Sequence, residues 1–317
     1  MNDVRSASRL AGTEMPAVTP SRGSSGRWLR AAAPYVFIGP SVVYLIIFTL
    51  IPLMDGLRLS FTETDLVNPS GGEGIGLRNY ENLLRSDQFW SSVGITLIYT
   101  VVTVVFAVGL GTAAAILLDS KFKGITVVRG IVAIPYAVPT VATALIFSWM
   151  YYNEGGILNR ISGALGLGRH GWVIDPSIAL VSVLIATVWV VFPIVMLVVL
   201  AALQSVPLEL REATWLDGAN RFQSFRAVTL PHILPVIQIM SLLMTIWSIR
   251  RFEIIFLLTG GGPLDSTNTL VVNIYRTAFQ NQQLGRAAAI GGLGLLLSLI
   301  VTGAYFLVQW WQMRKDR

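Results

Sequence analysis

Residues able to perform covalent or metal chemistry are scarce in this chain. None of the 317 residues is a cysteine, which excludes thiol catalysis, cysteine-bound metals and disulfides. The two histidines, His170 and His232, lie far apart in the sequence, so we expect no zinc site. Lysine occurs only at Lys121, Lys123 and Lys315, and no G-x-x-x-x-G-K-[ST] phosphate-binding loop is present. The sequence therefore predicts no catalytic residue, no metal and no cofactor in this chain, which is not expected to be an enzyme.

The most informative polar segment runs from residue 205 to residue 220 and reads SVPLELREATWLDGAN. Ser205 suits an N-cap, Pro207 suits a first helical turn, and Gly218 suits the left-handed residue that ends a helix. We predict a helix at about 207–217, which is too short to be stable alone in water and must dock on another surface. Its mixture of charged and apolar residues fits partial burial against a second protein, and it fits equally well a connector at the membrane surface.

Composition determines what kind of elements position this segment. Hydrophobic residues make up 54% of the chain and charged residues 13%, and the mean hydropathy is +0.65. Soluble domains carry roughly 25% charged residues, so an ordinary soluble enzyme, a disordered protein and a disulfide-stapled secreted domain are excluded. The net charge of +6 fits the basic cytoplasmic loops of a membrane protein better than nucleic-acid binding.

Six charge-free stretches are long enough to cross a bilayer, for which a helix needs about 20 residues. They cover residues 31–54, 88–118, 130–153, 176–208, 227–249 and 287–313. We predict an all-α membrane protein with six transmembrane helices in a domain at 31–317, preceded by a flexible cytoplasmic tail at 1–30. Lysine and arginine are denser in the tail and in the loops at 119–129 and 209–226 than in the alternate loops, which predicts that both termini are cytoplasmic.

One pattern within residues 205–231 is shared with a known family. The pattern consists of Glu212-Ala213-Thr214, Gly218, Val228 and Leu230-Pro231. It resembles the E-A-A-x3-G-x9-I-x-L-P loop of the permease subunits of binding-protein-dependent ABC importers. Thr214 and Val228 depart from this loop by small changes of shape. The resemblance implies that the loop couples to an ATPase through Glu212, Ala213, Thr214, Asp217, Gly218, Leu230 and Pro231.

Two further segments resemble the carbohydrate branch of that family, the maltose-type permeases. Residues 257–263 read LLTGGGP and residues 266–270 read STNTL, similar to the L-T-x-G-G-P…T-x-T-L signature. Residues 134–139 read IPYAVP, similar to a P-Y-A-V-P turn of the same branch. The resemblance extends from about residue 34 to the C-terminus of the sequence.

The resemblance implies a fold, a role and a set of partners. The fold is that of a type I ABC importer permease in the inner membrane of a bacterium or an archaeon. Two permease subunits form the pore, and a dimer of cytoplasmic ATPase subunits binds ATP and Mg. A binding protein outside the membrane delivers the solute, a sugar or a sugar or polyol derivative. ATP binding draws the coupling helices together and turns the pore from inward-open to outward-open, which is alternating access.

The resemblance also implies where the solute is held, namely in the fourth span and at the end of the fifth. The matching positions are Thr187, Trp189, Val190, Val191, Ile194, Met244, Ser248 and Arg251. Trp189 could stack on a sugar face, although helix or lipid packing explains it equally well. Ser248 could hydrogen-bond a hydroxyl group or serve as a small residue at a helix contact.

Arg251 is a charged residue at a position where an uncharged polar residue is expected. Three explanations remain open: an arginine that extends to water, an ion pair with Glu253, or a contact with an anionic group on the solute.

Two other classes of protein are less well supported by the sequence. A secondary transporter driven by an ion gradient favours carboxylates inside the spans, and the six stretches contain none. A membrane-embedded enzyme needs a cluster of His, Asp or Glu near a span end, and no such cluster occurs.

Overall fold

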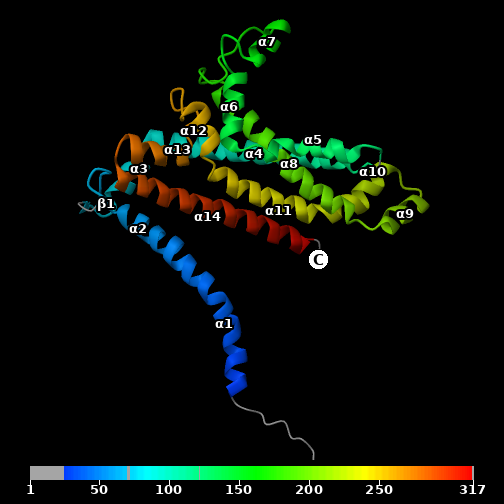
Figure 1. Ribbon diagram of the computed structural model, residues 1–317, viewed down its shortest axis with the longest axis horizontal. Helices are drawn as coiled ribbons and strands as arrows, with labels where there is room; N and C mark the ends of the chain where they lie inside the picture. Colours follow the sequence, from blue (N-terminus) through cyan, green and yellow to red (C-terminus); the bar gives the residue numbers. More distant parts are fainter. Residues whose placement is uncertain (1–24, 70–71, 121, 316–317) are drawn as a thin grey trace, which may run out of the picture. The chain divides into compact units, whose positions relative to one another are not determined.

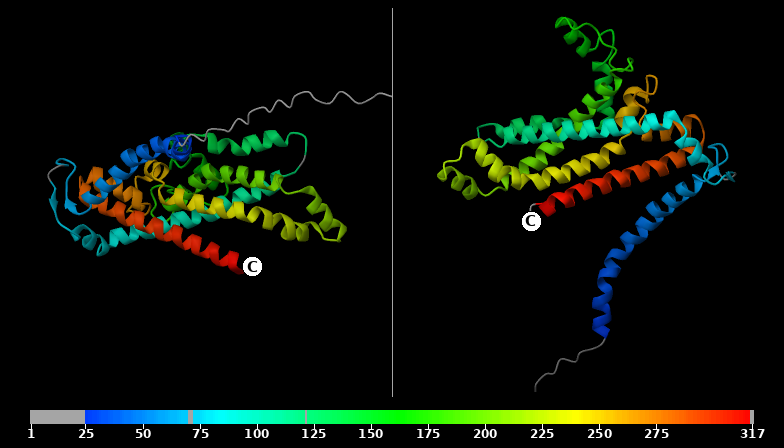
Figure 2. Two further views of the ribbon diagram at one scale, coloured as in Figure 1. Left: turned by 90° about the horizontal axis from the view of Figure 1, so that it is seen from below. Right: turned by 180° about the vertical axis from the view of Figure 1, so that it is seen from behind.

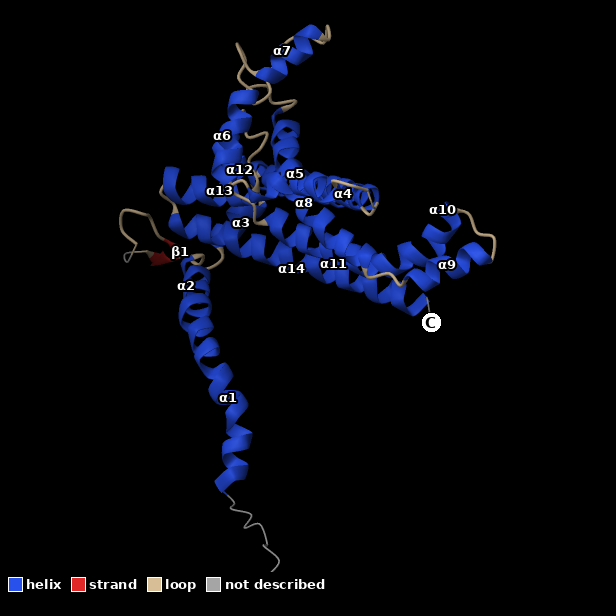
Figure 3. Ribbon diagram, turned by 45° about the vertical axis from the view of Figure 1, so that its right-hand side comes forward, coloured by secondary structure: helices blue, strands red, loops and turns tan. Residues whose placement is uncertain are grey.

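The computed structural model describes residues 25–69, 72–120 and 122–315. The described chain is almost entirely helical (Figures 1 and 3), which confirms the predicted all-α class. The strands β1 (Thr62–Glu63) and β2 (Glu73–Gly74) form one short antiparallel pair. The chain divides into two units, Met1–Asp55 and Gly56–Arg317, which are described separately below.

Fourteen α-helices and three π-helical turns are recorded in the described residues. They are α1 (Ser25–Leu45), η1 (Ile46–Leu50), α2 (Ile51–Leu59), α3 (Arg78–Leu84), α4 (Asp87–Leu118), α5 (Ile125–Ala137), α6 (Thr140–Met150), α7 (Ile157–Ala164), α8 (Ala179–Gln204), α9 (Leu208–Leu216), α10 (Arg221–Ser224), η2 (Phe225–Thr229), α11 (Leu230–Ile249), α12 (Glu253–Thr259), α13 (Leu270–Tyr275), η3 (Arg276–Gln280) and α14 (Leu284–Lys315).

The first unit contains α1, η1 and the start of α2. An apolar helical stretch of 25 residues begins here at Tyr35 and runs to Leu59, which is long enough to cross a membrane. Its large side chains are exposed, for example Phe37 and Phe48, as expected for a helix that faces lipid or a partner chain. The predicted tail at 1–30 falls largely outside the described residues, and its last six positions begin α1 instead of forming a flexible segment.

The second unit contains four helical stretches that are long and apolar enough to cross a membrane. They are Asp87–Leu118, Ala179–Gln204, Arg221–Ile249 and Leu284–Trp311. Each overlaps one of the predicted spans. The α4, α8, α11 and α14 helices form a bundle, with α9 and α10 at one end and α12 and α13 towards the other (Figures 1 and 2).

The predicted span at 130–153 is not one straight helix. It consists of α5 and α6, whose axes differ by 94°. Pro139 explains the break, because the proline ring disfavours helical backbone angles at the residue before it. Val138 accordingly adopts extended angles, with φ −77° and ψ 127°. The turn motif that resembles P-Y-A-V-P therefore separates two helical segments.

The core of the bundle lies where α4 crosses α8. Gly111 makes this crossing possible, since a Cβ atom there would lie 2.6 Å from Cβ of Val195 and 2.8 Å from the carbonyl oxygen of Phe192. Small residues allow membrane helices to approach closely. The resulting apolar cluster also includes α11 residues such as Ile233 and Met240, so that α4, α8 and α11 share one core.

Candidate coupling helix and solute site

The predicted short helix is present as α9, Leu208–Leu216. The proposed N-cap is wrong, however: Ser205 lies at the end of α8, and its hydroxyl donates to the carbonyl oxygen of Ala202 at 2.8 Å. The Ser205 hydroxyl also lies 3.2 Å from Nε2 of His232, near the start of α11. Ser205 therefore connects the end of α8 to α11 instead of starting α9.

Gly218 ends the helix as the sequence predicts. Its φ of +81° lies in the left-handed region, which favours glycine. The N–H of Ala219 donates to the carbonyl oxygen of Thr214 at 2.9 Å, which closes the turn around Gly218 in the manner of a Schellman motif. A Cβ atom at Gly218 would meet nothing within 4 Å, so backbone conformation alone restricts this position.

The α9 helix presents exposed apolar and acidic side chains. Leu208, Leu210 and Leu216 are 56%, 50% and 89% exposed, and Glu212 and Asp217 are also exposed. Large exposed apolar residues beside charges on a short helix are typical of an interaction surface. This exposure is compatible with both interpretations left open by the sequence, docking on a second protein and a connector at the membrane surface.

Some of the remaining residues of the E-A-A pattern are exposed, and others hold α9 in place on the rest of the chain. Ala213 is exposed, whereas the hydroxyl of Thr214 donates to Oγ of Ser224 at 2.7 Å and holds α9 against α10. Leu230 begins α11 and packs against the apolar core, and Pro231 next to it is exposed. The pattern thus joins an exposed helix to a core helix.

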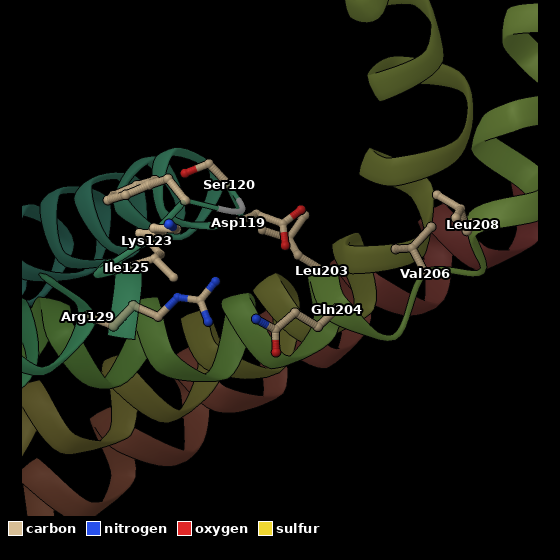
Figure 4. Close-up of a pocket in the computed structure, with 10 residues that line it drawn as sticks. Asp119, Ser120, Lys123, Ile125, Arg129, Leu203, Gln204, Val206 and Leu208 are labelled. Atoms are coloured by element: carbon tan, nitrogen blue, oxygen red, sulfur yellow. The ribbon is translucent and has the colours of Figure 1, made fainter. Parts of the chain in front are cut away.

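A cavity of about 700 Å³ lies beside the start of α9 (Figure 4). Its wall is formed by Asp119, Ser120, Phe122, Lys123, Ile125, Arg129, Leu203, Gln204, Val206 and Leu208. Nε and Nη2 of Arg129 donate to the carbonyl oxygen of Leu118 at 3.1 and 2.7 Å, which satisfies the C-terminal end of α4. Sequence reasoning missed this cavity and used the basic residues of the 119–129 loop only to orient the chain.

The predicted solute residues fall into two groups in the structure. Val190, Val191 and Met244 are buried together in the apolar core that α4, α8 and α11 share. Trp189 and Ile194 lie at its edge and remain partly exposed, with Trp189 edge-on to Phe147 at 5.5 Å between ring centroids.

The polar residues among the predicted solute contacts lie in the half of the bundle remote from α9. The hydroxyls of Thr187 and Tyr99 lie 2.8 Å apart, and Thr187 also donates to the carbonyl oxygen of Val183 at 2.9 Å. Both side chains are fully buried, and Ser248 is 3% exposed. Tyr99 was not selected from the sequence, because one tyrosine within an apolar span carries no distinguishing signal.

Arg251 follows α11 and is partly exposed, but its Nε is buried without a hydrogen-bond partner. The ion pair with Glu253 that the sequence left open is not formed: Glu253 is exposed, and among the described residues no carboxylate lies within ion-pairing distance of Arg251.

The loop after α12 is fixed by its own contacts. Gly260 and Gly261 have φ of +61° and +94°, and a Cβ at Gly261 would lie 2.9 Å from Cγ1 of Val272. Asp265 pairs with Arg276 and accepts a hydrogen bond from Nε2 of Gln88 at 3.0 Å. These contacts anchor the segment that resembles the carbohydrate-branch signature to α4 and η3.

An apolar helix bundle with a short exposed helix at one end fits a membrane component of a transport system. The chain belongs to the family of binding-protein-dependent transport system inner membrane components, whose match covers residues 107–312. It is a permease subunit of an ABC importer, and the predicted family is confirmed.

Relatives of known name agree with this family. The trehalose/maltose transport system permease MalF of Thermococcus litoralis is 34% identical over 285 residues, covering 89% of this chain and 95% of that protein. A probable ABC transporter permease, y4oQ of Sinorhizobium fredii, is 35% identical over 277 residues, with coverage of 87% and 89%. The sulfoquinovosyl glycerol transport system permease SmoG of Agrobacterium fabrum is 29% identical over 273 residues, with coverage of 86% and 89%.

The fold also matches a solved structure. A crystal structure of a bacterial ABC transporter that imports alginate superposes with a TM-score of 0.79 and 23% identity, covering 90% of this chain and 98% of that chain. At this identity the match concerns the fold, and it confirms the type I importer permease architecture.

Proposed function

We propose that this chain forms one half of a pore that moves a sugar or a sugar or polyol derivative into the cytoplasm by alternating access. The observation that carries the proposal is the exposed α9 helix, which combines unpartnered leucines with carboxylates in a chain that has no phosphate-binding loop. The names of the relatives support the solute class, since they include permeases for trehalose or maltose and for sulfoquinovosyl glycerol.

The proposal assigns energy supply to partner chains. A dimer of ABC ATPase subunits with bound ATP and Mg receives α9 in the cytoplasm, where both termini of this chain also lie. A second permease subunit completes the pore, and an extracytoplasmic binding protein delivers the solute. The relatives are permease components of such systems.

The contacts around α9 explain how movement of the ATPase would reach the pore. Thr214 is hydrogen-bonded to Ser224 of α10, which continues through η2 into α11. Ser205 at the end of α8 lies in contact with His232 of α11. Because α8 and α11 share one densely packed core, a displacement of α9 is transmitted to both helices together.

The partly exposed solute residues are proposed to line the pore that two permease subunits form. Trp189 and Ile194 keep partial exposure at the edge of the core and offer an aromatic and an aliphatic surface. Ser248 supplies a hydroxyl and Arg251 a cation. The other predicted solute residues are buried in the protein interior and are proposed to hold these side chains in position; they are Thr187, Val190, Val191 and Met244.

The test is ATP-driven uptake by the reconstituted importer. The chain is co-expressed with its companion permease, the ATPase and the binding protein, and proteoliposomes are loaded with ATP and Mg without an ion gradient. We expect sugar uptake that requires the binding protein and ATP. Uptake that proceeds without ATP and stops when a protonophore is added would instead establish the gradient-driven alternative.

A further inference from the structure

The charge of Arg251 has no counter-ion in the described chain. Arg251 lies at the junction of α11 and α12, in the half of the bundle remote from α9 (Figure 1). Its backbone N–H donates to the carbonyl oxygen of Ser248 at 3.1 Å, which places the two residues in one turn. The adjacent Arg250 is exposed and therefore keeps its hydration.

Arg251 is partly exposed, and one nitrogen of its side chain, Nε, lies in a different environment from that of an arginine that extends fully into water. An extended interfacial arginine keeps its guanidinium hydrated while its aliphatic part covers apolar surface. Here the Nε atom of the guanidinium is itself buried and makes no hydrogen bond. Removing a charged donor from water without a partner is unfavourable.

The surrounding groups cannot neutralise this charge. Tyr99, Thr187 and Ser248 carry no carboxylate, and the hydroxyls of Tyr99 and Thr187 are already paired with each other. Glu253 is exposed and forms no ion pair with Arg251. An anion supplied from outside the chain would provide both the missing acceptor and the missing charge.

The guanidinium group selects the chemistry of that anion. Its planar fork donates two parallel hydrogen bonds to a carboxylate, a phosphate or a sulfonate, and such charge-assisted pairs are stronger than neutral hydrogen bonds. Hydroxyl groups of a neutral sugar cannot supply the compensating charge.

We propose that Arg251 binds an anionic group of the transported solute, so that the importer carries sugar or polyol derivatives bearing a carboxylate, phosphate or sulfonate. This inference rests on the proposed function, because it requires the chain to form a solute path. It adds the charge of the solute and names the residue that selects for it.

The first experiment measures the charge preference of the path directly. Because the chain lacks cysteine, Ser248→Cys introduces a single reactive thiol beside Arg251. In the reconstituted complete importer, its reaction rates are compared for a methanethiosulfonate ending in a sulfonate and one ending in a trimethylammonium group. We expect the ratio of sulfonate to trimethylammonium rates to fall at least about tenfold in Arg251→Gln, equivalent to about 1.4 kcal/mol.

Two matched variants separate binding from structural effects. Arg250→Gln removes the neighbouring exposed charge and should leave the ratio unchanged, whereas Arg251→Lys keeps the charge and should retain most of the sulfonate preference. An unreactive thiol, an unchanged ratio in Arg251→Gln, or an equal change in Arg250→Gln would overturn the proposal.

The second experiment separates this inference from the proposed function. Uptake of trehalose and of trehalose 6-phosphate is measured in the same proteoliposomes. ATP-driven uptake of trehalose that is unaffected by Arg251→Gln would leave sugar import standing and overturn the anion proposal. Uptake of trehalose 6-phosphate that is lost in Arg251→Gln and retained in Arg250→Gln would support it. Failure of every ATP-driven uptake would count against the proposed function, and the labelling ratio would then decide the role of Arg251.

Discussion

At the scale of single residues, two glycines are required for different physical reasons. Gly111 is required by space, because Val195 and the Phe192 backbone occupy the position of its absent side chain. Gly218 is required by conformation, because its φ is +81° although the surrounding space is empty. Substitutions at these positions should therefore fail in different ways.

Gly111→Ala should destabilise the packing of α4 on α8. An added methyl group in a filled core typically costs about 1–3 kcal/mol, so the melting temperature of the purified importer in detergent should fall. Gly109→Ala is the matched control, because Gly109 lies on the same helix and a Cβ atom there would meet nothing within 4 Å. Equal melting temperatures for both variants would refute the close-contact interpretation.

Gly218→Ala should weaken coupling without unfolding the bundle. The left-handed conformation costs a residue with a side chain roughly 1–2 kcal/mol, which disfavours the turn that ends α9. Stimulation of the ATPase by the loaded binding protein should fall, whereas Gly218→Asn should be milder because asparagine tolerates this conformation. The idea fails if the alanine and asparagine variants both stimulate normally.

Among the elements, α9 exposes leucines that no contact within the described chain covers. Nine residues do not form a stable helix alone, so its partners decide whether it holds its shape. Within the chain it is held by the hydrogen bond from Thr214 to Ser224, whereas Glu212 and the leucines of α9 are exposed.

Glu212→Lys should uncouple transport or release the ATPase while membrane insertion stays intact. Reversal of the charge replaces an attraction at a protein–protein contact with a repulsion, and we expect solute uptake to fall at least about tenfold, or about 1.4 kcal/mol. Co-purification of the ATPase and uptake are measured together. Glu154→Lys is the control, because Glu154 is exposed on a loop remote from α9. Normal uptake and normal ATPase stimulation in Glu212→Lys would remove the coupling role from α9.

At the scale of the whole molecule, the prediction concerns which loops face the cytoplasm. Basic residues favour cytoplasmic loops, which places the segment 209–226 inside and the segment 55–87 outside. Val67 and Phe222 are 79% and 71% exposed and lie in these two segments. Both can be changed to cysteine in a chain without native thiols.

Val67→Cys should react with a membrane-impermeant maleimide in intact spheroplasts, and Phe222→Cys only after permeabilisation. The unmodified chain serves as the blank. Labelling of Val67→Cys that requires permeabilisation would invert the proposed orientation and move α9 away from the ATPase.

The class of fold, the position of the long apolar helices and the family can be predicted from the amino-acid sequence alone. These follow from local properties: the absence of charge over about 20 residues, the left-handed preference of Gly218, and the spacing of the E-A-A pattern. The short helix at 208–216 could be predicted for the same reason.

Contacts between residues distant in the sequence could not be predicted and are seen only in the folded chain. The sequence did not show that α5 and α6 diverge by 94°, that Ser205 belongs to the end of α8, or that a cavity lies beside α9. It left three explanations for Arg251, and the structure removes one of them, because Glu253 is exposed and forms no ion pair with Arg251 in the described chain. The physical reason is that hydrophobic composition specifies that a helix is buried in lipid or protein but not which neighbour it touches, whereas burial and pairing of a charge are properties of neighbours distant in sequence.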